Sequence, residues 1–348
     1  MLQIFIGALV AICIFYKAPK VPLNSSLLAL AFLVIIGFLY AMSGGYYESL
    51  FSLIAFALLV FFSFYIASNN LLAIERIKNI YVFCCVFVAG GLFFQVILHN
   101  FLDVIFFRHE LFGGSRNAYS FIWMDYSFIS LFVVSCMPIV WGYKNKLLSL
   151  CIIPFLLFAS IATSARTGIA AVVLFLLALL TWEWGFSLVK GRVSFSQVLL
   201  TLFLIALPFM AMYALPVITG RQLSTSSSGR FEDFAKGFQF FLEHPWFGSL
   251  LNKEIYGSIV GAVPHNIFIF PLLMGGVVYF FAFMLFLILL IKDVRCADSS
   301  ILASVLICFF GFQFIPSFFS SYFFAILLGV AMASAKLNNA NYYRLMAK

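Results

Sequence analysis

The chain has 348 residues, of which 65% are hydrophobic and only 9% are charged, and its net charge is +8. A soluble domain carries about 25% charged residues, so this composition excludes an ordinary soluble globule, and it is too hydrophobic for a disordered chain. The long apolar runs predict an all-α fold, a polytopic transmembrane helical bundle, because a transmembrane barrel shows short alternating strands instead. The basic excess indicates loop charges that orient a membrane protein and does not indicate nucleic-acid binding.

Apolar runs of about 20 residues span a bilayer, and the pattern predicts about eleven spans, with ten or twelve as alternatives. The expected spans are 1–16, 22–42, 49–68, 79–98, 118–141, 147–163, 167–182, 196–217, 266–291, 301–316 and 319–335. We treat residues 1–348 as a single integral-membrane domain. The first apolar run has no preceding basic residue and no small-residue cleavage site, so a cleaved signal is not expected.

The charges of the connections predict the orientation of the chain. Alternate connections carry basic pairs, beginning with Lys17 and Lys20, and the C-terminal tail is basic as well. Together they hold thirteen of the twenty basic residues, so this side and the C-terminus are predicted to be cytoplasmic. The opposite, outer side has two longer loops, at about 99–117 and 218–265, which contain six of the twelve acidic residues and all four histidines. Function is therefore expected at the outer face of the membrane.

The longer loop is predicted to contain an amphipathic helix. Four aromatic residues recur there at three- and four-residue steps, which is the spacing of one helical face: Phe231, Phe234, Phe238 and Phe241. Ser228 is the expected N-cap, and Pro245 and Gly248 are expected to end the helix. Its apolar face is expected on the membrane surface or on the ends of the spans.

Arg166 is the first candidate for chemistry. It stands in the sequence TSARTG, between two apolar runs and at their outer ends. A guanidinium near lipid costs several kcal/mol by most estimates, so such a residue usually faces a polar cavity or a partner. The group keeps its charge and presents a fork suited to phosphate. The alternative is an arginine that only extends to the interface from a helix end.

Arg230 opens the predicted amphipathic helix. Helix N-termini present free N–H groups and a partial positive charge, so they bind anions. A cation there is unfavourable for the isolated helix, which favours a bound anion at this position. The alternative is a solvated residue beside a flexible loop.

His265 stands in VPHNIFIF, at the outer mouth of the ninth expected span. Histidine can act as a general base near neutral pH, and Asn266 beside it is a candidate for orienting a sugar hydroxyl. The alternative is an interfacial histidine with a satisfied hydrogen bond. His99 and His244 are weaker candidates because they are expected in loops.

Arg116 precedes the fifth expected span, and Asp125 is placed about two turns inside it. An acid inside a membrane is a functional candidate by default, and its expected partner is Arg116 or Arg166. The alternative is an ion pair that only holds helices together. The sequence has no P-loop, GxSxG, HExxH or paired-carboxylate motif, so we expect no metal ion or other cofactor.

Three segments in order carry a family resemblance: TSARTGIAA, GRFEDFAKGFQFFLEHPWFG and PHNIFIFPLLMGGVVYF. Together they resemble the O-antigen ligase and O-antigen polymerase superfamily, which are bacterial inner-membrane glycosyltransferases that use lipid-linked sugars. TSARTGIAA resembles the family's Ser-x-Arg-x-Gly turn. The segment that begins GRFEDF is similar to the start of its periplasmic loop, with a Pro-x-x-Gly close. The segment that begins PHNIF resembles its His-Asn entry to the next span, although the loop is short for the family.

The resemblance implies an inverting, metal-independent transfer from a glycan on undecaprenyl pyrophosphate. In that scheme Arg166 and Arg230 hold the pyrophosphate, and His265 acts on the acceptor hydroxyl as a base or a positioning group. Preorganised arginines can neutralise a leaving diphosphate when no metal is present. The implied partners are the undecaprenyl-pyrophosphate-linked oligosaccharide, the acceptor glycan, membrane lipids and a chain-length regulator. Three further residues are supporting candidates: Arg116, Asp125 and Asn266.

Several functions remain open at this point. A repeat-unit polymerase is favoured slightly over a ligase, which transfers the chain to lipid A–core, because the loop is short. A lipid-linked oligosaccharide flippase would need polar residues through the membrane and on both faces, whereas only Asp125 is expected deep in a span. A purely structural subunit would not need the two arginines and the histidine on one face.

Overall fold

The computed structural model describes residues 24–346 apart from several short segments and one longer one. The segments left out are 45–46, 69, 106, 113–115, 123–124, 191–197, 199–200, 203–229, 262 and 316–317. The expected span 1–16, most of the expected span 196–217 and the expected cap at Ser228 therefore lie outside the described residues.

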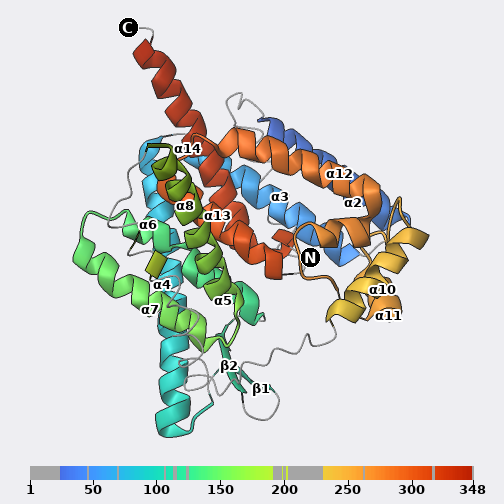
Figure 1. Cartoon of the computed structure of the whole chain (residues 1–348), viewed down its shortest axis with the longest axis horizontal. Coiled ribbons are helices and arrows are strands. Elements are labelled where there is room, and N and C mark those ends of the chain that lie inside the picture. The colour runs from blue at the N-terminus through green and yellow to red at the C-terminus, as the bar shows by residue number, and fades with distance from the viewer. Residues whose placement is uncertain are drawn as a thin grey trace. The chain divides into compact units, whose positions relative to one another are not determined.

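The described part of the chain is helical except for one β-hairpin (Figure 1). The N-terminal helices and strands are α2 (Ser25–Met42), α3 (Tyr47–Ala67), α4 (Leu71–Leu102), β1 (Arg108–Phe112), β2 (Arg116–Phe121), α5 (Tyr126–Ser135) and α6 (Met137–Trp141). The remaining elements are α7 (Lys146–Ala162), α8 (Thr167–Lys190), α10 (Arg230–Glu243), α11 (Lys253–Val260), α12 (Ile269–Val294), α13 (Ser299–Gly311), η1 (Phe312–Phe314), η2 (Phe318–Ser320) and α14 (Tyr322–Met346).

Among the described residues, 5 helices are long and apolar enough to cross a membrane: α2, α3, α4, α8 and α12. Shorter apolar helices occupy Tyr126–Trp141, Lys146–Ala162 and Ser299–Phe314. The prediction of an all-α, multi-pass membrane bundle is confirmed, and the number of spans stays a prediction.

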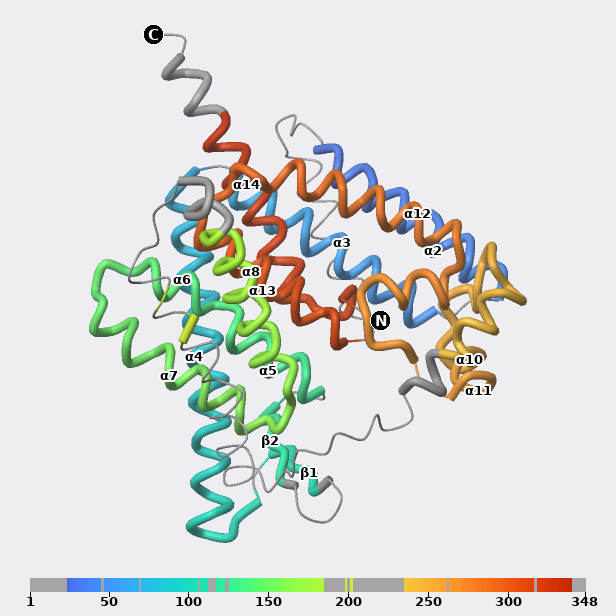
Figure 2. Tube along the Cα trace, in the orientation of Figure 1, coloured from blue at the N-terminus to red at the C-terminus, as the bar shows by residue number. Residues whose placement is uncertain are grey.

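The chain divides into two compact units. The first unit comprises residues 1–78, 227–305 and 312–348, and the second comprises residues 79–226 and 306–311. The tube in Figure 2 follows the chain through both.

In the first unit, α14 packs along α3, and α12 packs along α2 (Figure 1). Gly329 lets the first pair approach closely, because a Cβ there would overlap the Ser63 hydroxyl and lie 2.5 Å from the Val60 carbonyl oxygen. Small residues at such contacts are typical of membrane helices, which associate through close packing. Beside this contact, the rings of Phe56 and Phe318 meet edge to face with their centroids 5.3 Å apart.

A carboxylate from one helix caps the start of another in the same unit. Asp293, near the end of α12, accepts hydrogen bonds from the Ser26 backbone N–H at 3.0 Å and from the Ser26 hydroxyl at 2.7 Å. A negative charge is favourable at a helix N-terminus because the first N–H groups lack helical partners. This contact fixes the start of α2 against the end of α12.

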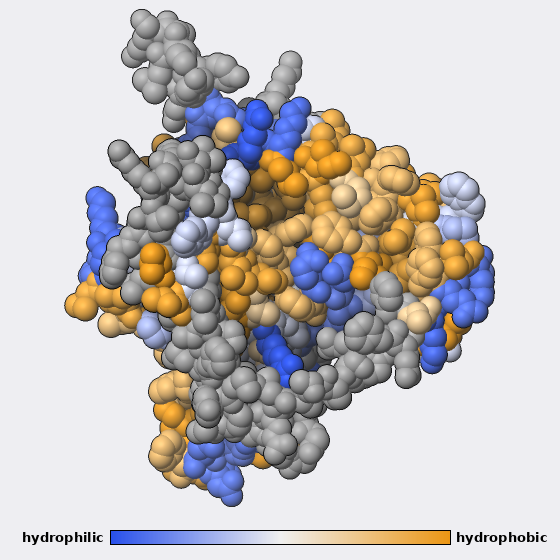
Figure 3. All heavy atoms as spheres, viewed as in Figure 1, coloured by the Kyte–Doolittle hydropathy of each residue, from blue (hydrophilic) through white to orange (hydrophobic). Residues whose placement is uncertain are grey.

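The outer faces of α2 and α12 are apolar, and Figure 3 shows this apolar surface. Phe32 and Phe38 of α2 and Phe281 and Ile288 of α12 are all exposed. A continuous apolar surface of this kind is unfavourable in water and suits contact with lipid.

In the second unit, α5 packs against α7 and α8, and a hairpin precedes α5. Strands β1 and β2 pair antiparallel, with Glu110 opposite Ala118. The buried Gln95 of α4 holds the hairpin, because its amide donates to the Arg108 carbonyl at 2.8 Å and accepts from the Phe121 N–H at 3.0 Å.

The hairpin corrects the prediction of a fifth span over 118–141, since residues 116–121 form β2 and the helix begins only at Tyr126. The Gly-Gly-Ser segment between two aromatic-rich runs is typical of a hairpin connection. A further correction concerns the loop expected at 99–117: α4 continues to Leu102, so His99 lies on a helix and not in a loop.

Candidate functional site

Arg166 lies in the turn between α7 and α8, in the second unit. The turn follows Ala162, the last residue of α7, and Arg166 directly precedes Thr167, the first residue of α8. The Arg166 carbonyl accepts the N–H of Ala170 at 2.9 Å, and its side chain is exposed. The guanidinium therefore stands at the N-terminus of a helix, where the partial positive charge of the helix favours an anion.

Small residues hold this turn rigid. Ser164 is buried and has a φ of 60°, a left-handed conformation that few residues other than glycine adopt. The Gly168 N–H donates to the Ser130 hydroxyl at 3.1 Å, and that hydroxyl lies 2.7 Å from the Ser160 hydroxyl. A Cβ on Gly168 would lie 2.5 Å from the Ser130 carbonyl oxygen, so only glycine fits there. The turn that presents Arg166 is thus fixed against α5.

In the first unit, the long loop packs into a break in α12. Gly276 interrupts the helix with φ 68° and ψ −175°. The Val277 N–H donates to the Pro245 carbonyl at 2.8 Å, and the Met274 carbonyl accepts the Ser249 N–H at 3.0 Å. The loop therefore satisfies backbone groups that the break leaves without helical partners, which an apolar environment requires. Two of the three motif segments quoted from the sequence meet at this contact.

The amphipathic helix predicted in the loop is α10, which packs on α11 and α12 (Figure 2). Phe240 is only 3% exposed, and its ring meets Tyr256 edge to face at 5.4 Å. Gly237 lies on the same face, because a Cβ there would overlap the Tyr256 hydroxyl. Phe238, which the residue spacing assigns to the apolar face, is 50% exposed. The buried face is thus that of Gly237 and Phe240, and the exposed Phe238 suits a membrane surface.

Arg230 is the first residue of α10, as the sequence predicted for the start of the helix. Its side chain lies outside the described residues. Arg230 and His265 belong to the first unit and Arg166 to the second. The convergence of the three side chains in one site stays a prediction.

His265 precedes α12 and is exposed. Its Nδ1 lies 3.3 Å from the Phe314 carbonyl oxygen. Both ends of the neighbouring Asn266 amide form hydrogen bonds within the protein. Its oxygen accepts the Phe268 N–H at 2.9 Å, and its nitrogen donates to Gln313 at 3.0 Å. Asn266 thus fixes the segment that carries His265.

Asp125 is not inside a span, and that prediction is wrong. Its exposed carboxylate accepts the N–H groups of Ser127 at 2.7 Å and Phe128 at 3.1 Å, so Asp125 is the N-cap of α5. The reason is the hairpin, which takes up the residues expected to form the first turns of the span. No ion pair of Asp125 occurs among the described side chains. Arg116 opens β2 opposite Phe112, and its side chain is outside the described part.

Two histidines meet at the base of the hairpin in the second unit. The His99 and His109 rings lie 4.7 Å apart between centroids. His99 Nδ1 is 2.6 Å from the Tyr119 hydroxyl, and His109 Nε2 is 3.0 Å from the Asn117 amide oxygen. These polar contacts tie α4 to the hairpin.

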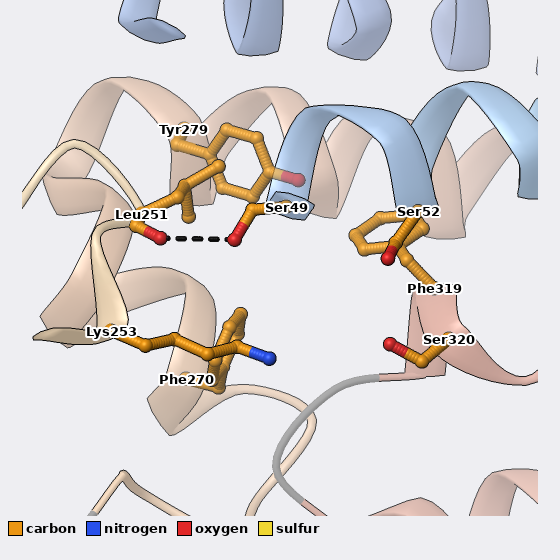
Figure 4. Close-up of a pocket in the computed structure, with 8 residues that line it drawn as sticks. All are labelled: Ser49, Ser52, Leu251, Lys253, Phe270, Tyr279, Phe319 and Ser320. Atoms are coloured by element: carbon orange, nitrogen blue, oxygen red, sulfur yellow. Dashed lines mark hydrogen bonds between the residues drawn. The ribbon is translucent and has the colours of Figure 1, made fainter. Parts of the chain in front are cut away.

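Sequence reasoning missed Lys253, which points into a pocket of the first unit (Figure 4). Lys253 is the first residue of α11, and the Asn252 side chain caps that helix by accepting the Glu254 N–H at 3.0 Å. A basic residue that opens a helix is the signal that identified Arg230, and the same signal identifies Lys253. Within the described part of the chain, no group of three or more His, Cys, Asp or Glu residues could hold a metal ion.

A comparison with protein families matches residues 151–284 to the family described as O-antigen ligase. The matched range contains Arg166, Arg230 and His265, together with the break in α12. No curated protein matches the chain. The family match confirms the resemblance drawn from the three motifs, because residues 151–284 of this membrane protein match the O-antigen ligase family.

Proposed function

We propose that the protein is a polysaccharide repeat-unit polymerase of a bacterial inner membrane. It moves a glycan from undecaprenyl pyrophosphate to a sugar hydroxyl of an acceptor glycan, at the periplasmic face. The observation that carries the proposal is the exposed Arg166 guanidinium, held at a helix N-terminus by a rigid turn within the matched domain. That arrangement favours a ligand with a phosphate charge.

In the proposed reaction the acceptor hydroxyl attacks the anomeric carbon of the donor. The bond from that carbon to the pyrophosphate oxygen breaks, its electron pair leaves on the diphosphate, and the anomeric configuration inverts. Arg166 and Arg230 stabilise the charge that grows on the leaving group, in place of a metal ion. The proton of the acceptor hydroxyl passes to His265.

The surroundings of His265 support a role as a base. When Nδ1 carries the ring proton, it donates to the Phe314 carbonyl, and Nε2 then keeps the lone pair that a general base requires. The exposure of the side chain leaves Nε2 accessible to a substrate.

The charges within individual helices support one common face for Arg166 and His265. Helix α7 begins at Lys146 and α8 ends at Lys190, so both helices carry a lysine at the end away from the Arg166 turn. Helix α12 carries Lys292 in its last turn, at the end away from His265. By the positive-inside rule, these lysines support a periplasmic position for Arg166 and His265.

The proposal is tested with Arg166→Ala, Arg230→Ala and His265→Ala in a polymerase-deletion strain. Each substitution should lower the transfer rate by about 10²–10³, the usual cost of losing one charge-stabilising contact, and remove long chains from a lipopolysaccharide gel. Arg76→Ala, at an exposed arginine near the start of α4, is the matched control and should keep the normal ladder. Normal chain lengths in all three variants, with normal insertion, would refute the site.

The family description favours another candidate, an O-antigen ligase that transfers the chain to lipid A–core. A gel of the deletion strain separates the two functions. Core that carries a single repeat unit identifies the polymerase, which would also act with a chain-length regulator. Loss of every O-antigen band identifies the ligase.

A further inference from the structure

Another polar site lies in the first unit, and its lining includes none of the residues proposed for transfer. A pocket opens between the first turns of α3, the start of α11, the start of α12 and η2 (Figure 4). Its polar lining includes Lys253, Ser49, Ser52 and Ser320, and its apolar lining includes the rings of Phe270 and Phe319.

The polar groups of the pocket include one ammonium, which can only donate hydrogen bonds, and serine hydroxyls, which can donate and accept them. Figure 4 shows the Lys253 ammonium pointing into the pocket, where the hydroxyls of Ser52 and Ser320 also lie. Among the described residues, none accepts a hydrogen bond from these three groups or forms an ion pair with Lys253. Ser49 donates to the Leu251 carbonyl at 3.0 Å.

Among the residues that the structure describes, none of those that line this pocket has a carboxylate. The acidic neighbours in the sequence, Glu48 and Glu254, are exposed and outside the lining. The serine hydroxyls beside this half-buried cation are neutral and supply no counter-charge, and a ligand that supplies one is an anion with several acceptor oxygens.

Two helix starts add to the preference for an anion. Ser49 and Ser52 lie in the first two turns of α3, which begins at Tyr47, so the partial positive charge of that N-terminus adds to the Lys253 charge. Lys253 itself occupies the first position of α11, where the helix dipole disfavours a cation unless an anion is near.

The apolar part of the site favours a lipid as the source of the anion. Phe270 and Phe319 are buried rings at the wall of the pocket. On the same turns of α3, Tyr47 and Phe51 expose their rings to the outside of the unit. A charged head group beside an apolar chain would match a polar pocket beside exposed rings.

We propose that this pocket binds a phosphoryl group of a membrane lipid, with Lys253 as its cationic contact. The lipid is either a polyprenyl phosphate of the kind that the proposed reaction uses or an anionic glycerophospholipid. The identification of the lipid as a polyprenyl phosphate rests on the proposed function. The binding of a phosphoryl group in the pocket does not depend on that function.

The test measures lipid binding to the purified full-length protein in detergent micelles. The probes are undecaprenyl phosphate, phosphatidylglycerol, zwitterionic phosphatidylethanolamine and inorganic phosphate. Lys253→Ala should weaken binding of the preferred phosphate lipid about 10- to 100-fold, the usual effect of losing a charge-assisted hydrogen bond. Lys253→Arg should stay within a few-fold of the native affinity because the charge remains.

Lys236→Ala is the matched control, because it removes the same charge from an exposed position on α10 and should leave lipid binding unchanged. Ser320→Leu, at an exposed position, should narrow the pocket and weaken binding even if Lys253→Ala fails to fold. The proposal would be overturned if Lys253→Ala and Ser320→Leu bound the lipid as tightly as the native protein does. It would also be overturned if Lys236→Ala lost as much lipid binding as Lys253→Ala. If inorganic phosphate at the same concentration as the lipid displaced all of the bound lipid, the ligand of the pocket would not be a lipid.

The probes also separate the two lipids. Preference for undecaprenyl phosphate supports the substrate lipid, and equal binding of phosphatidylglycerol supports a general anionic lipid. Arg166→Ala should lose glycan transfer while it keeps lipid binding at the pocket. If no form of the protein transfers glycans but Lys253 still controls lipid binding, the proposed function fails and the pocket assignment stands.

Discussion

Basic side chains at helix starts are the recurring feature of this protein at the scale of single residues. Arg166 precedes α8, Arg230 opens α10 and Lys253 opens α11. A cation in each of these positions is unfavourable for the helix dipole and becomes favourable when an anion binds there. This shared position is the reason that negatively charged ligands are proposed for all three residues.

Asp298 gives a prediction on pH at the same scale. Burial acts to raise the pKa of this carboxyl, but the hydrogen bond from the Ser300 hydroxyl and the charge of Lys78, 3.7 Å away, outweigh it and lower the pKa below its ordinary value. Because the folded pKa is lowered, the carboxylate stabilises the fold above its unfolded pKa of about 3.9. That stabilisation is lost as the pH falls through the folded pKa.

Asp298→Asn should therefore lower the melting temperature at pH 7, and the difference from the native protein should shrink as the pH falls below about 4. Thermal unfolding in detergent across this pH range measures the effect. Asp103→Asn is the control, because Asp103 is exposed. A difference between Asp298→Asn and the native protein that is constant with pH would contradict the assignment.

At the scale of elements, two contacts between a turn and a helix position the motif residues, and each depends on glycine. Gly168 lets the Arg166 turn lie against α5, and Gly276 lets the long loop enter the break in α12. Both contacts join segments that are far apart in the sequence, so one fixes the turn that carries Arg166 and the other fixes the loop that carries α10.

Gly168→Ala should destabilise the second unit by about 1–3 kcal/mol, the usual cost of overpacking, because its Cβ would meet the backbone of Ser130. Thermal unfolding measures this loss. Gly90→Ala in α4 is the matched control, since no heavy atom lies within 4 Å of a Cβ there, and it should leave stability unchanged or raise it by about 0.5–1 kcal/mol. Equal melting temperatures for both variants would contradict the packing described for this turn.

Gly276→Ala should cost more, about 2–4 kcal/mol, because its φ of 68° is strained for alanine and its Cβ would also lie 2.5 Å from the Phe247 nitrogen. The variant should also lose glycan transfer, since the loop that carries α10 is displaced. Gly257→Ala in α11, with open space around its Cβ, serves as the control for thermal unfolding and for transfer. Native stability in Gly276→Ala would show that the break in α12 does not depend on glycine.

At the scale of the whole molecule, the proposed reaction requires the Arg166 turn and the His265 segment to meet at one face of the membrane. Cysteines at Ala165 and Val263, next to these residues, should be joined by a short bifunctional thiol reagent in native membranes. Ala165→Cys paired with the native Cys296 is the control, because Cys296 follows the far end of α12 and should not be joined. Absence of a link between positions 165 and 263 would remove the basis for a shared active site.

The sequence by itself determined the membrane bundle, the Arg166 turn and helix α10, because apolar run length, glycine and proline positions and helical periodicity are local properties. Only the tertiary structure decided that Asp125 caps a helix after a hairpin. It also joined Pro245 to Val277 across the break in α12 and placed Lys253 among serines from α3 and η2. Each of these depends on hydrogen bonds and packing between segments distant in the chain, which the hydropathy of any single segment does not encode.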